Sequence, residues 1–340
     1  MDAMRTPIDY TKHDRQIWDE ELESFVPRRI FDAHAHLFWH DHLPARHPKL
    51  KAWCDADHAI HRAWARRLYP GREIHFLHLG TPVPGIDVGR HNAFIAHELK
   101  KDARSRANLL VTPACTPDAI ATAVRQPGVI GLKPYRMFSV NGNPDTCRIR
   151  EFFPEAQLEV ANDLGLWVTL HLSRYHAAAD RYNLRDLADY TQKRYPRIKW
   201  ILAHCARSFT YWPIRESVER LRGLPNIFYD LSAVCDVRPI LTLFQKEDVR
   251  RIFFGSDGIS PTFFRGGYFA LGRSWITISR AHFSEPTFPH CDGRPILAIY
   301  ENLLAIKQAA EMAGLGRKEI ESIFWGNAAR EFLSHPSPLP

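Results

Sequence analysis

The sequence predicts a protein of the α/β class, a single-domain (β/α)8 TIM barrel. Three observations lead to this prediction: eight short apolar segments recur along the chain, helix-like stretches fill most of the gaps between them, and the pattern extends over about 230 residues. Strands that are separated by helices pair in parallel. Parallel strands of this number close into a barrel, so residues 30–334 are expected to form one domain.

The predicted strands are short runs of mainly apolar residues. An open, doubly wound sheet would also alternate strands with helices, but it favours a glycine-rich phosphate loop after the first strand. No such loop follows residues 30–37, which favours the barrel. The eight expected strands are Ile30–Leu37, Glu73–Leu79, Asn108–Pro113, Val129–Tyr135, Leu166–Leu172, Lys199–Cys205, Ile227–Leu231 and Arg251–Asp257.

The predicted helices occupy most of the connections, and two more follow the last strand. Residues 38–71 and 258–294 form longer connections, which commonly build the substrate pocket of a barrel. Residues 1–29 are expected to be an N-terminal arm and residues 335–340 a proline-rich tail. The expected helices are Arg90–Arg104, Pro117–Arg125, Phe153–Leu164, Leu184–Tyr195, Ile214–Leu221, Pro239–Phe244, Pro295–Ala313 and Arg317–Leu333.

Composition and charge exclude several classes of protein. An apolar fraction of 45% in 340 residues is ample for a core, and no run approaches the roughly 18 apolar residues of a membrane span. The six cysteines form no C-x-x-C pair, and residues 1–25 contain no apolar signal region, so we expect a cytoplasmic protein. The net charge of +7 includes no long basic run, which favours a small anionic substrate over nucleic acid. We also expect no membrane contact and a homodimer.

The first predicted strand contains a candidate metal-binding pair. Its alternation places Asp32, His34 and His36 on one face, toward the barrel interior, and Phe31, Ala33, Ala35 and Leu37 on the other, toward the helices. Two imidazoles two residues apart at a strand end can converge on one cation. Because the chain has 18 histidines, one such pair is expected by chance, and His40-Asp41-His42 is interpreted as loop.

The same placement recurs on other strands. His171 and His204 lie near the ends of the fifth and sixth strands, Asp257 ends the eighth, and Lys133 has inward parity on the fourth. The functional groups of a barrel come from the carboxyl ends of its strands. Each residue alone has a structural interpretation, but several imidazoles and a carboxylate on one rim indicate a site for Zn²⁺, Mn²⁺ or Fe²⁺.

These motifs resemble the amidohydrolase superfamily, in its amidohydrolase-related (amidohydrolase 2) branch of metal-dependent TIM-barrel hydrolases and decarboxylases. The resemblance covers about residues 30–333. The resembling motifs are Phe31-Asp32-Ala33-His34-Ala35-His36, Leu170-His171, Leu202-Ala203-His204-Cys205, Phe254-Gly255-Ser256-Asp257 and the late Gly326-Asn327-Ala328-Ala329-Arg330.

The resemblance implies roles for individual residues. His34, His36, His171 and Asp257 would bind one divalent metal ion, for which Zn²⁺ is expected first and Mn²⁺ or Fe²⁺ next. Asp257 would also take a proton from the attacking water. His204 would bind a second metal ion, orient the substrate or move protons, and Lys133 would either bridge two ions as a carboxylated lysine or face the substrate as a cation. One ion is expected rather than two.

The implied activity is metal-dependent hydrolysis of an amide, ester or lactone in a small anionic, cyclic molecule. The alternatives are decarboxylation of a cyclic or aromatic acid and, from another class, a barrel that only binds. Tyr135, Arg136, Arg174 and Arg207 could contact the substrate, although each arginine could equally pair with a structural Asp or Glu. Aromatic residues of the long loops could either line a pocket for a ring or serve as packing; they are Phe38, Trp39, Phe263, Phe264 and Tyr268.

Overall fold

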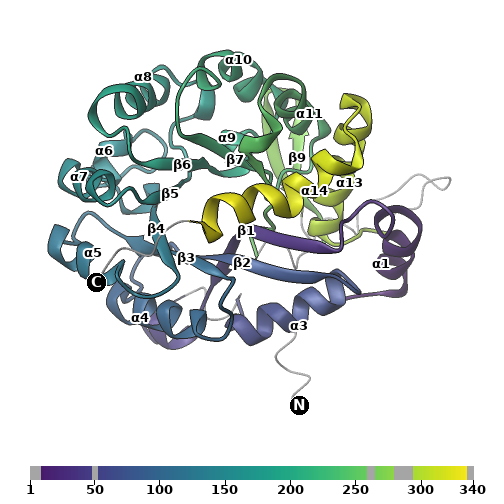
Figure 1. Cartoon of the computed structure of the whole chain (residues 1–340), viewed down its shortest axis with the longest axis horizontal. Helices are drawn as coiled ribbons and strands as arrows, with labels where there is room; N and C mark the ends of the chain where they lie inside the picture. Colours follow the sequence, from purple (N-terminus) through teal and green to yellow (C-terminus); the bar gives the residue numbers. More distant parts are fainter. Residues whose placement is uncertain (1–8, 48–52, 259–264, 279–293, 335–340) are drawn as a thin grey trace.

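The computed structural model describes residues 9–47, 53–258, 265–278 and 294–334, and it confirms the predicted barrel. Eight strands pair in parallel in the order in which they occur along the chain. Figure 1 shows β1 to β7 following one another around the barrel. Backbone hydrogen bonds between the first strand and the residues that follow the eighth close the ring, among them Ala33 N to Phe254 O at 2.9 Å. The strands are β1 (Arg29–Leu37), β2 (Glu73–Gly80), β3 (Arg106–Val111), β4 (Val129–Pro134), β5 (Trp167–Leu170), β6 (Lys199–Leu202), β7 (Ile227–Asp230) and β8 (Ile252–Phe253).

Helices connect the strands and cover the outside of the barrel (Figure 1). All of the predicted helical stretches contain helix, although most of their ends differ from the predicted ones. They are α4 (Val88–Leu99), α5 (Pro117–Ala123), α7 (Glu155–Asp163), α8 (Arg181–Asp189), α10 (Tyr211–Leu221), α11 (Val237–Lys246), α13 (Ala298–Ala313) and α14 (Arg317–Glu321), the last continued by the π-helical turns η9 (Ser322–Gly326) and η10 (Ala329–Leu333).

The first long connection contains a helix that the sequence analysis missed. Helix α3 (His58–Leu68) begins where the Asp57 side chain accepts a hydrogen bond from the backbone N–H of Ile60 at 2.8 Å. Its buried face includes His58, His61 and Trp64. Two of these inward positions are histidines, so the apolar periodicity that marks an amphipathic helix was hidden.

The second long connection contains a two-stranded antiparallel hairpin, β9 (Gly267–Leu271) and β10 (Ser274–Ile278). The turn between the strands places Gly272 at φ +61°, a conformation that glycine adopts without steric cost. A short loop with glycine between two apolar runs is a hairpin signal, and reading the whole segment as a loop overlooked it.

A β-bulge in β1 corrects the predicted alternation of this strand. The register with β2 shifts by one residue between Asp32 and Ala35. Below the shift, Phe31 and Ala33 pack in the interior cluster of the barrel instead of against the helices. Above it, Ala35 and Leu37 pack outward as predicted. The extra residue reverses the alternation part-way along the strand, so a strict period of two was wrong for this strand.

The amino end of the barrel is closed by the C-terminal helical segment, which is yellow in Figure 1 and lies across the strands. The Phe332 ring lies 4.9 Å from that of Trp167 and 5.0 Å from that of Phe253, both inside the barrel. Asn327 donates to the backbone carbonyls of Val249 and Ile252 at 2.8 and 2.9 Å, which ties this segment to β8. Because these aromatic side chains fill the amino end of the barrel, a functional site is expected at the opposite end, where the strands terminate.

A buried histidine at the start of β2, paired with two carboxylates, predicts a pH dependence of stability. His75 Nδ1 lies 2.6 Å from Asp102 Oδ2 and Nε2 lies 3.0 Å from Glu73 Oε1. Burial alone would lower the pKa of His75, but hydrogen bonds with both carboxylates raise it above its ordinary value. A raised folded-state pKa stabilises the fold below the unfolded-state pKa of about 6.5, and this contribution is lost as pH rises through the folded-state pKa.

We therefore expect His75→Gln to lower the free energy of unfolding by about 1.5 kcal/mol at pH 6 and by progressively less as pH rises. Urea unfolding of both proteins from pH 6 upward measures this difference. If the difference between the two free energies of unfolding stayed constant over this pH range, the claim that His75 is charged in the folded protein would be contradicted.

Candidate active site

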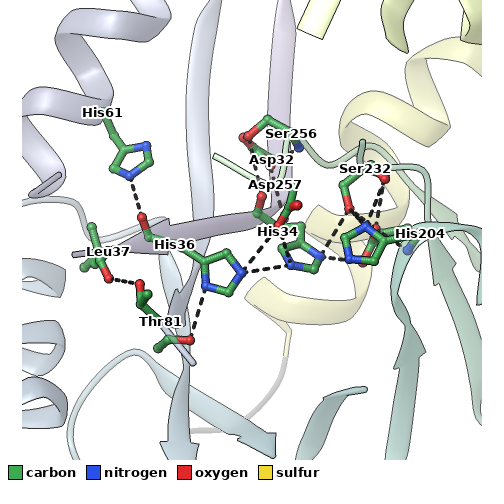
Figure 2. Close-up of polar contacts among 12 residues, drawn as sticks. Asp32, His34, His36, Leu37, His61, Thr81, His204, Ser232, Ser256 and Asp257 are labelled. Carbon is green, nitrogen blue, oxygen red and sulfur yellow. Dashed lines mark hydrogen bonds and ion pairs between the residues drawn. The ribbon is translucent and has the colours of Figure 1, made fainter. Parts of the chain in front are cut away.

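Three side chains converge where β1 and β8 end. His34 Nε2 and His36 Nε2 are 3.2 Å apart, and Asp257 Oδ1 lies 3.2 Å from the first and 3.4 Å from the second (Figure 2). The two histidines share a face because they are two residues apart, and the bulge in β1 lets this face point inward although Phe31 and Ala33 also lie inside the barrel. Asp257 adopts φ +56°, a left-handed conformation that asparagine and aspartate tolerate better than most residues.

His204, at the end of β6, lies beside this group. Its ring centroid is 5.0 Å from that of His34, and one ligand atom each of His34, His204 and Asp257 lies within 4.8 Å of the others. Among the described residues, His34, His204 and Asp257 are the group of three His, Cys, Asp or Glu side chains that lies close enough together to hold a metal ion. Residues predicted as neighbours from three distant segments are therefore neighbours in space.

The hydrogen bonds of the outer ring nitrogens define which tautomers are present. His36 Nδ1 lies 3.2 Å from the Gly80 carbonyl and His204 Nδ1 lies 3.0 Å from that of Ser232, so both Nδ1 atoms carry the proton and donate. His34 Nδ1 donates in the same way to Asp230 at 2.9 Å. The Nε2 lone pairs of His34 and His36 then face the Asp257 carboxylate. Such groups repel one another unless a cation lies between them, so the donor set fits a divalent metal ion.

Asp230, at the end of β7, is a candidate site residue that the sequence analysis missed. It is fully buried and accepts hydrogen bonds from the backbone N–H groups of His204 and Ser232, both at 3.1 Å, in addition to the His34 imidazole. Burial alone would raise its pKa, but His34 and His204 hold it below its ordinary value. Asp230 thus orients two candidate ligands. The signal was present, because an aspartate follows an apolar run at the same rim.

Asp32 links β1 to β8 beneath the cluster. Its carboxylate accepts from Ser256 N at 2.9 Å and Ser256 Oγ at 2.5 Å, and burial raises its pKa to about 7. These hydrogen bonds anchor the residue that precedes Asp257. Burial would also raise the pKa of Asp257, but the neighbouring His204, His34 and His36 lower it below the ordinary range. The Asp257 carboxylate is therefore ionised at neutral pH.

His171 was predicted as a metal ligand, and it adjoins the cluster through the ring of His204. Its ring lies 5.1 Å from that of His204 and 5.0 Å from that of Tyr135. Burial, followed by the nearby His204 and Arg207, lowers its pKa well below its ordinary value, so the ring is neutral. A neutral imidazole can bind a metal ion, and its assignment as a ligand stays a prediction.

Lys133 is completely buried, and its ammonium nitrogen has no hydrogen-bond partner. The nitrogen lies 5.6 Å from the centroid of the Tyr135 ring. Burial lowers the pKa of Lys133 to about 8, although the charges of Asp230 and Asp257 act in the opposite direction. The side chain has the inward direction that the sequence predicted, and its unsatisfied nitrogen is available to a substrate or a bridging role.

Two of the three predicted substrate arginines are paired with structural acids. Arg136 forms an ion pair with Asp145, and Arg174 Nε lies 3.0 Å from Asp180 Oδ1. Arg207 has no carboxylate within 4.0 Å in the described part of the chain, and it donates to the Arg174 carbonyl at 2.7 Å. The alternative that the sequence left open is thus borne out for Arg136 and Arg174.

His204 and Arg207 belong to a left-handed turn. His204, Cys205, Ala206 and Arg207 all have φ between +50° and +58°, and Ser208 N donates to His204 O at 2.8 Å to close the turn. Left-handed backbone costs a non-glycine residue roughly 1–2 kcal/mol. The buried Cys205 and Ala206 side chains help to hold this conformation. Strain of this kind persists where the surrounding packing enforces it, commonly at functional sites.

The aromatic residues of the loops divide into packing and site-facing groups. Phe38 is buried against Trp53 with ring centroids 5.4 Å apart, and Trp39 packs on Phe94 at 5.6 Å. Tyr268 reaches the site through Phe209, which stacks on His204 with centroids 5.3 Å apart. Phe263 and Phe264 lie outside the described residues.

The second H-x-H motif lies away from the cluster. Residues 40–42 form a single 3₁₀ turn, in which the His40 imidazole contacts Asp55 at 2.7 Å and His42 contacts His91 at 3.1 Å. Its interpretation as a connecting segment is confirmed.

The fold and this site together define a (β/α)8 barrel with an imidazole–carboxylate cluster at the carboxyl ends of its strands. The chain belongs to the amidohydrolase family (amidohydrolase 2), whose model matches residues 31–332. This family and the solved structures that resemble the chain comprise enzymes, both hydrolases and decarboxylases. No curated protein matches the chain.

Solved structures share the fold at low sequence identity. A 5-carboxyvanillate decarboxylase from Sphingomonas paucimobilis superposes with a TM-score of 0.55 at 14% identity, covering 90% of this chain and 99% of that one. A probable 2-pyrone-4,6-dicarboxylic acid hydrolase from Acinetobacter baumannii, with citric acid bound, gives 0.55 at 14%, covering 89% and 98%. A dihydroxybenzoic acid decarboxylase from Polaromonas sp. JS666, with manganese and 2-nitroresorcinol bound, gives 0.56 at 15%, covering 91% and 98%.

The described part of the chain contains no helix that is both long and apolar enough to cross a membrane.

The position of Lys133 leads to a prediction about metal stoichiometry. Lys133→Met keeps most of the buried volume but removes the ammonium group, so we expect one metal ion per chain before and after the change. Turnover should fall by roughly 100-fold if the cation stabilises charge in the transition state. Elemental analysis of both purified proteins measures the stoichiometry. A drop from two ions per chain would instead establish Lys133 as a carboxylated bridge.

Proposed function

We propose that the protein is a metal-dependent hydrolase that cleaves an amide, ester or lactone bond in a small, anionic, cyclic substrate. The observation that carries the proposal is the convergence of unprotonated imidazole nitrogens from His34, His36 and His204 on the ionised Asp257 carboxylate. This arrangement lies at the open end of the barrel, where substrates reach the strand ends.

His34, His36 and Asp257 would hold one divalent ion, and His171 or His204 would complete its coordination. Neutral imidazoles and a carboxylate suit Zn²⁺ first and Mn²⁺ or Fe²⁺ next. Such an ion would activate water at neutral pH and polarise the carbonyl group that is attacked.

The remaining steps belong to side chains of the chain itself. Asp257 is ionised and can accept a proton from the attacking water, then return it to the leaving group. Lys133, with a pKa of about 8, is mainly protonated at neutral pH and can balance the charge that develops on the carbonyl oxygen. His204, held by Ser232 and Asp230, can orient the substrate with its free Nε2.

Decarboxylation of a cyclic or aromatic acid is the second candidate, and one observation favours it. Lys133 and Arg207 present two cationic groups that form no ion pair within 4.0 Å in the described part of the chain. Carboxylates further away still act on them, Asp230 and Asp257 on Lys133 and Asp145 on Arg207. Such cationic groups suit a carboxylated aromatic substrate. The decarboxylases from Sphingomonas paucimobilis and Polaromonas have this barrel fold as well. In this reaction Asp257 would first take up a proton from water and then deliver it to the carbon from which carbon dioxide leaves.

Product analysis distinguishes the two candidates. The purified protein, with its metal content measured, is incubated with lactones, anilides, aryl esters and hydroxybenzoic acids. The hydrolase proposal expects release of an acid from one of the first three classes without carbon dioxide. Carbon dioxide from a hydroxybenzoic acid, with no hydrolysis, would replace it with the second candidate. A protein that binds no Zn²⁺, Mn²⁺ or Fe²⁺ would contradict both.

A further inference from the structure

The first long connection returns to the barrel through α3, and one side chain of this helix reaches the candidate metal site. His61 is buried, and its Nε2 lies 2.9 Å from the backbone carbonyl of His36, as Figure 2 shows. Burial lowers the pKa of His61 to about 4, so a neutral imidazole donates this hydrogen bond at pH 7. His61 therefore acts on the backbone of a candidate ligand and not on its imidazole.

The hydrogen bond from His61 satisfies a backbone carbonyl near the end of β1. The His36 N–H donates to the Gly258 carbonyl at 3.2 Å. Because the N–H and C=O groups of one strand residue point to the same side, the His36 carbonyl also points toward this edge, where it accepts from the His61 side chain. A buried carbonyl without a donor costs free energy, so this bond favours one backbone position for the end of β1.

Gly258 brings the same imidazole against the residue that follows Asp257. A Cβ atom at this position would lie 3.0 Å from Cε1 of His61, which is closer than most Cβ atoms come to a neighbour, so the approach favours glycine. The Gly258 N–H in turn faces the His34 carbonyl at 3.4 Å. His61 thus contacts both chain segments that carry the candidate ligands, the end of β1 with His34 and His36 and the segment with Asp257.

We propose that His61 is a positioning residue that fixes the end of β1, so that His36 and Asp257 are directed at the same metal ion. The inference rests on the proposed function and adds a residue of α3 to that site. The Gly80 carbonyl already orients the His36 imidazole through Nδ1, and His61 fixes the backbone from which this imidazole extends. Partners that orient metal ligands in this way commonly change metal affinity by about 10- to 100-fold.

Zn²⁺ binding to the purified full chain, measured by competition with a chromophoric chelator, tests this role. His61→Met keeps most of the buried volume and removes the donor, so it should raise the Zn²⁺ dissociation constant at least about tenfold. His61→Gln can still donate from its amide to the His36 carbonyl and should stay within about threefold of the unaltered protein. If His61→Met does not fold, His61→Asn takes its place, because its amide is too short to reach the carbonyl.

His58→Met is the matched control. His58 lies one turn earlier on α3 and is equally buried, but its Nδ1 lies 3.0 Å from His78 Nε2 and not beside the end of β1. Both methionine variants lose a buried imidazole, and only His61→Met should weaken Zn²⁺ binding. Equal weakening in the two variants, or an unchanged dissociation constant in folded His61→Met, would overturn the inference.

Hydrogen exchange separates this inference from the proposed function. In the metal-free protein, the backbone amides of residues 35–37 should exchange at least about tenfold faster in His61→Met and at an unchanged rate in His58→Met, as measured by mass spectrometry. An unchanged rate in His61→Met would contradict the positioning role whether or not a metal ion binds. Zn²⁺ binding that depends on His61 in a protein that hydrolyses no substrate would contradict the proposed hydrolase and leave the positioning role standing.

Discussion

Asp257→Asn is expected to reduce kcat by roughly 10³-fold or more while the barrel stays folded. Asparagine keeps the size of the side chain and tolerates the left-handed backbone at this position, where φ is +56°. It removes the negative charge that the surrounding imidazoles stabilise and the lone pair that would accept a proton from water. The measurement is steady-state turnover with the substrate found by product analysis, together with circular dichroism and metal analysis.

The exposed Asp163→Asn at the end of α7 is the matched control and should retain full activity. Asp257→Asn with the kcat of the unaltered protein would remove Asp257 from the role of base. If metal content fell in parallel with kcat, the loss would report its role as a ligand instead.

His34→Ala is expected to lower metal occupancy from one ion per chain to a small fraction and to lower turnover at least 100-fold. His34 Nε2 is the central donor of the cluster, 3.2 Å from both His36 Nε2 and Asp257 Oδ1. The change also strips Asp230 of its 2.9 Å partner and leaves a buried carboxylate less well compensated. We therefore expect a loss of about 3 kcal/mol in the free energy of unfolding.

Elemental analysis and urea unfolding measure the two effects of His34→Ala. The exposed His97→Ala on α4 is the control, and it should change neither occupancy nor stability appreciably. Full metal occupancy in His34→Ala would contradict the ligand assignment. An unchanged free energy of unfolding would show that the hydrogen bond from His34 does not stabilise the buried Asp230 carboxylate.

Much of the candidate site could be predicted because of a property of parallel barrels. The strands run in the same direction, so residues at their carboxyl ends meet on one rim regardless of their separation in the chain. This rule predicts from the sequence that His34, His36, His204 and Asp257 lie close together. It applies equally to Asp230, which ends the seventh strand.

Local backbone irregularities could not be predicted in the same way. The bulge in β1 inserts one residue, and no residue type in that strand signals it, so Phe31 and Ala33 were assigned to the wrong face. The left-handed turn at residues 204–207 contains no glycine or asparagine, which are the usual indications of positive φ. Packing from the rest of the barrel imposes both features.

The sequence by itself determined the barrel, its strand order and the set of ionisable groups at its mouth, because periodicity and chain direction are local properties that parallel pairing converts into a common rim. Only the tertiary structure decided which charges remain unpaired. Arg136 and Arg174 find Asp145 and Asp180, whereas Arg207 does not, and nothing in the spacing of these residues distinguishes them. Electrostatic pairing depends on distances of a few ångströms between segments far apart in the chain, and folding alone establishes those distances.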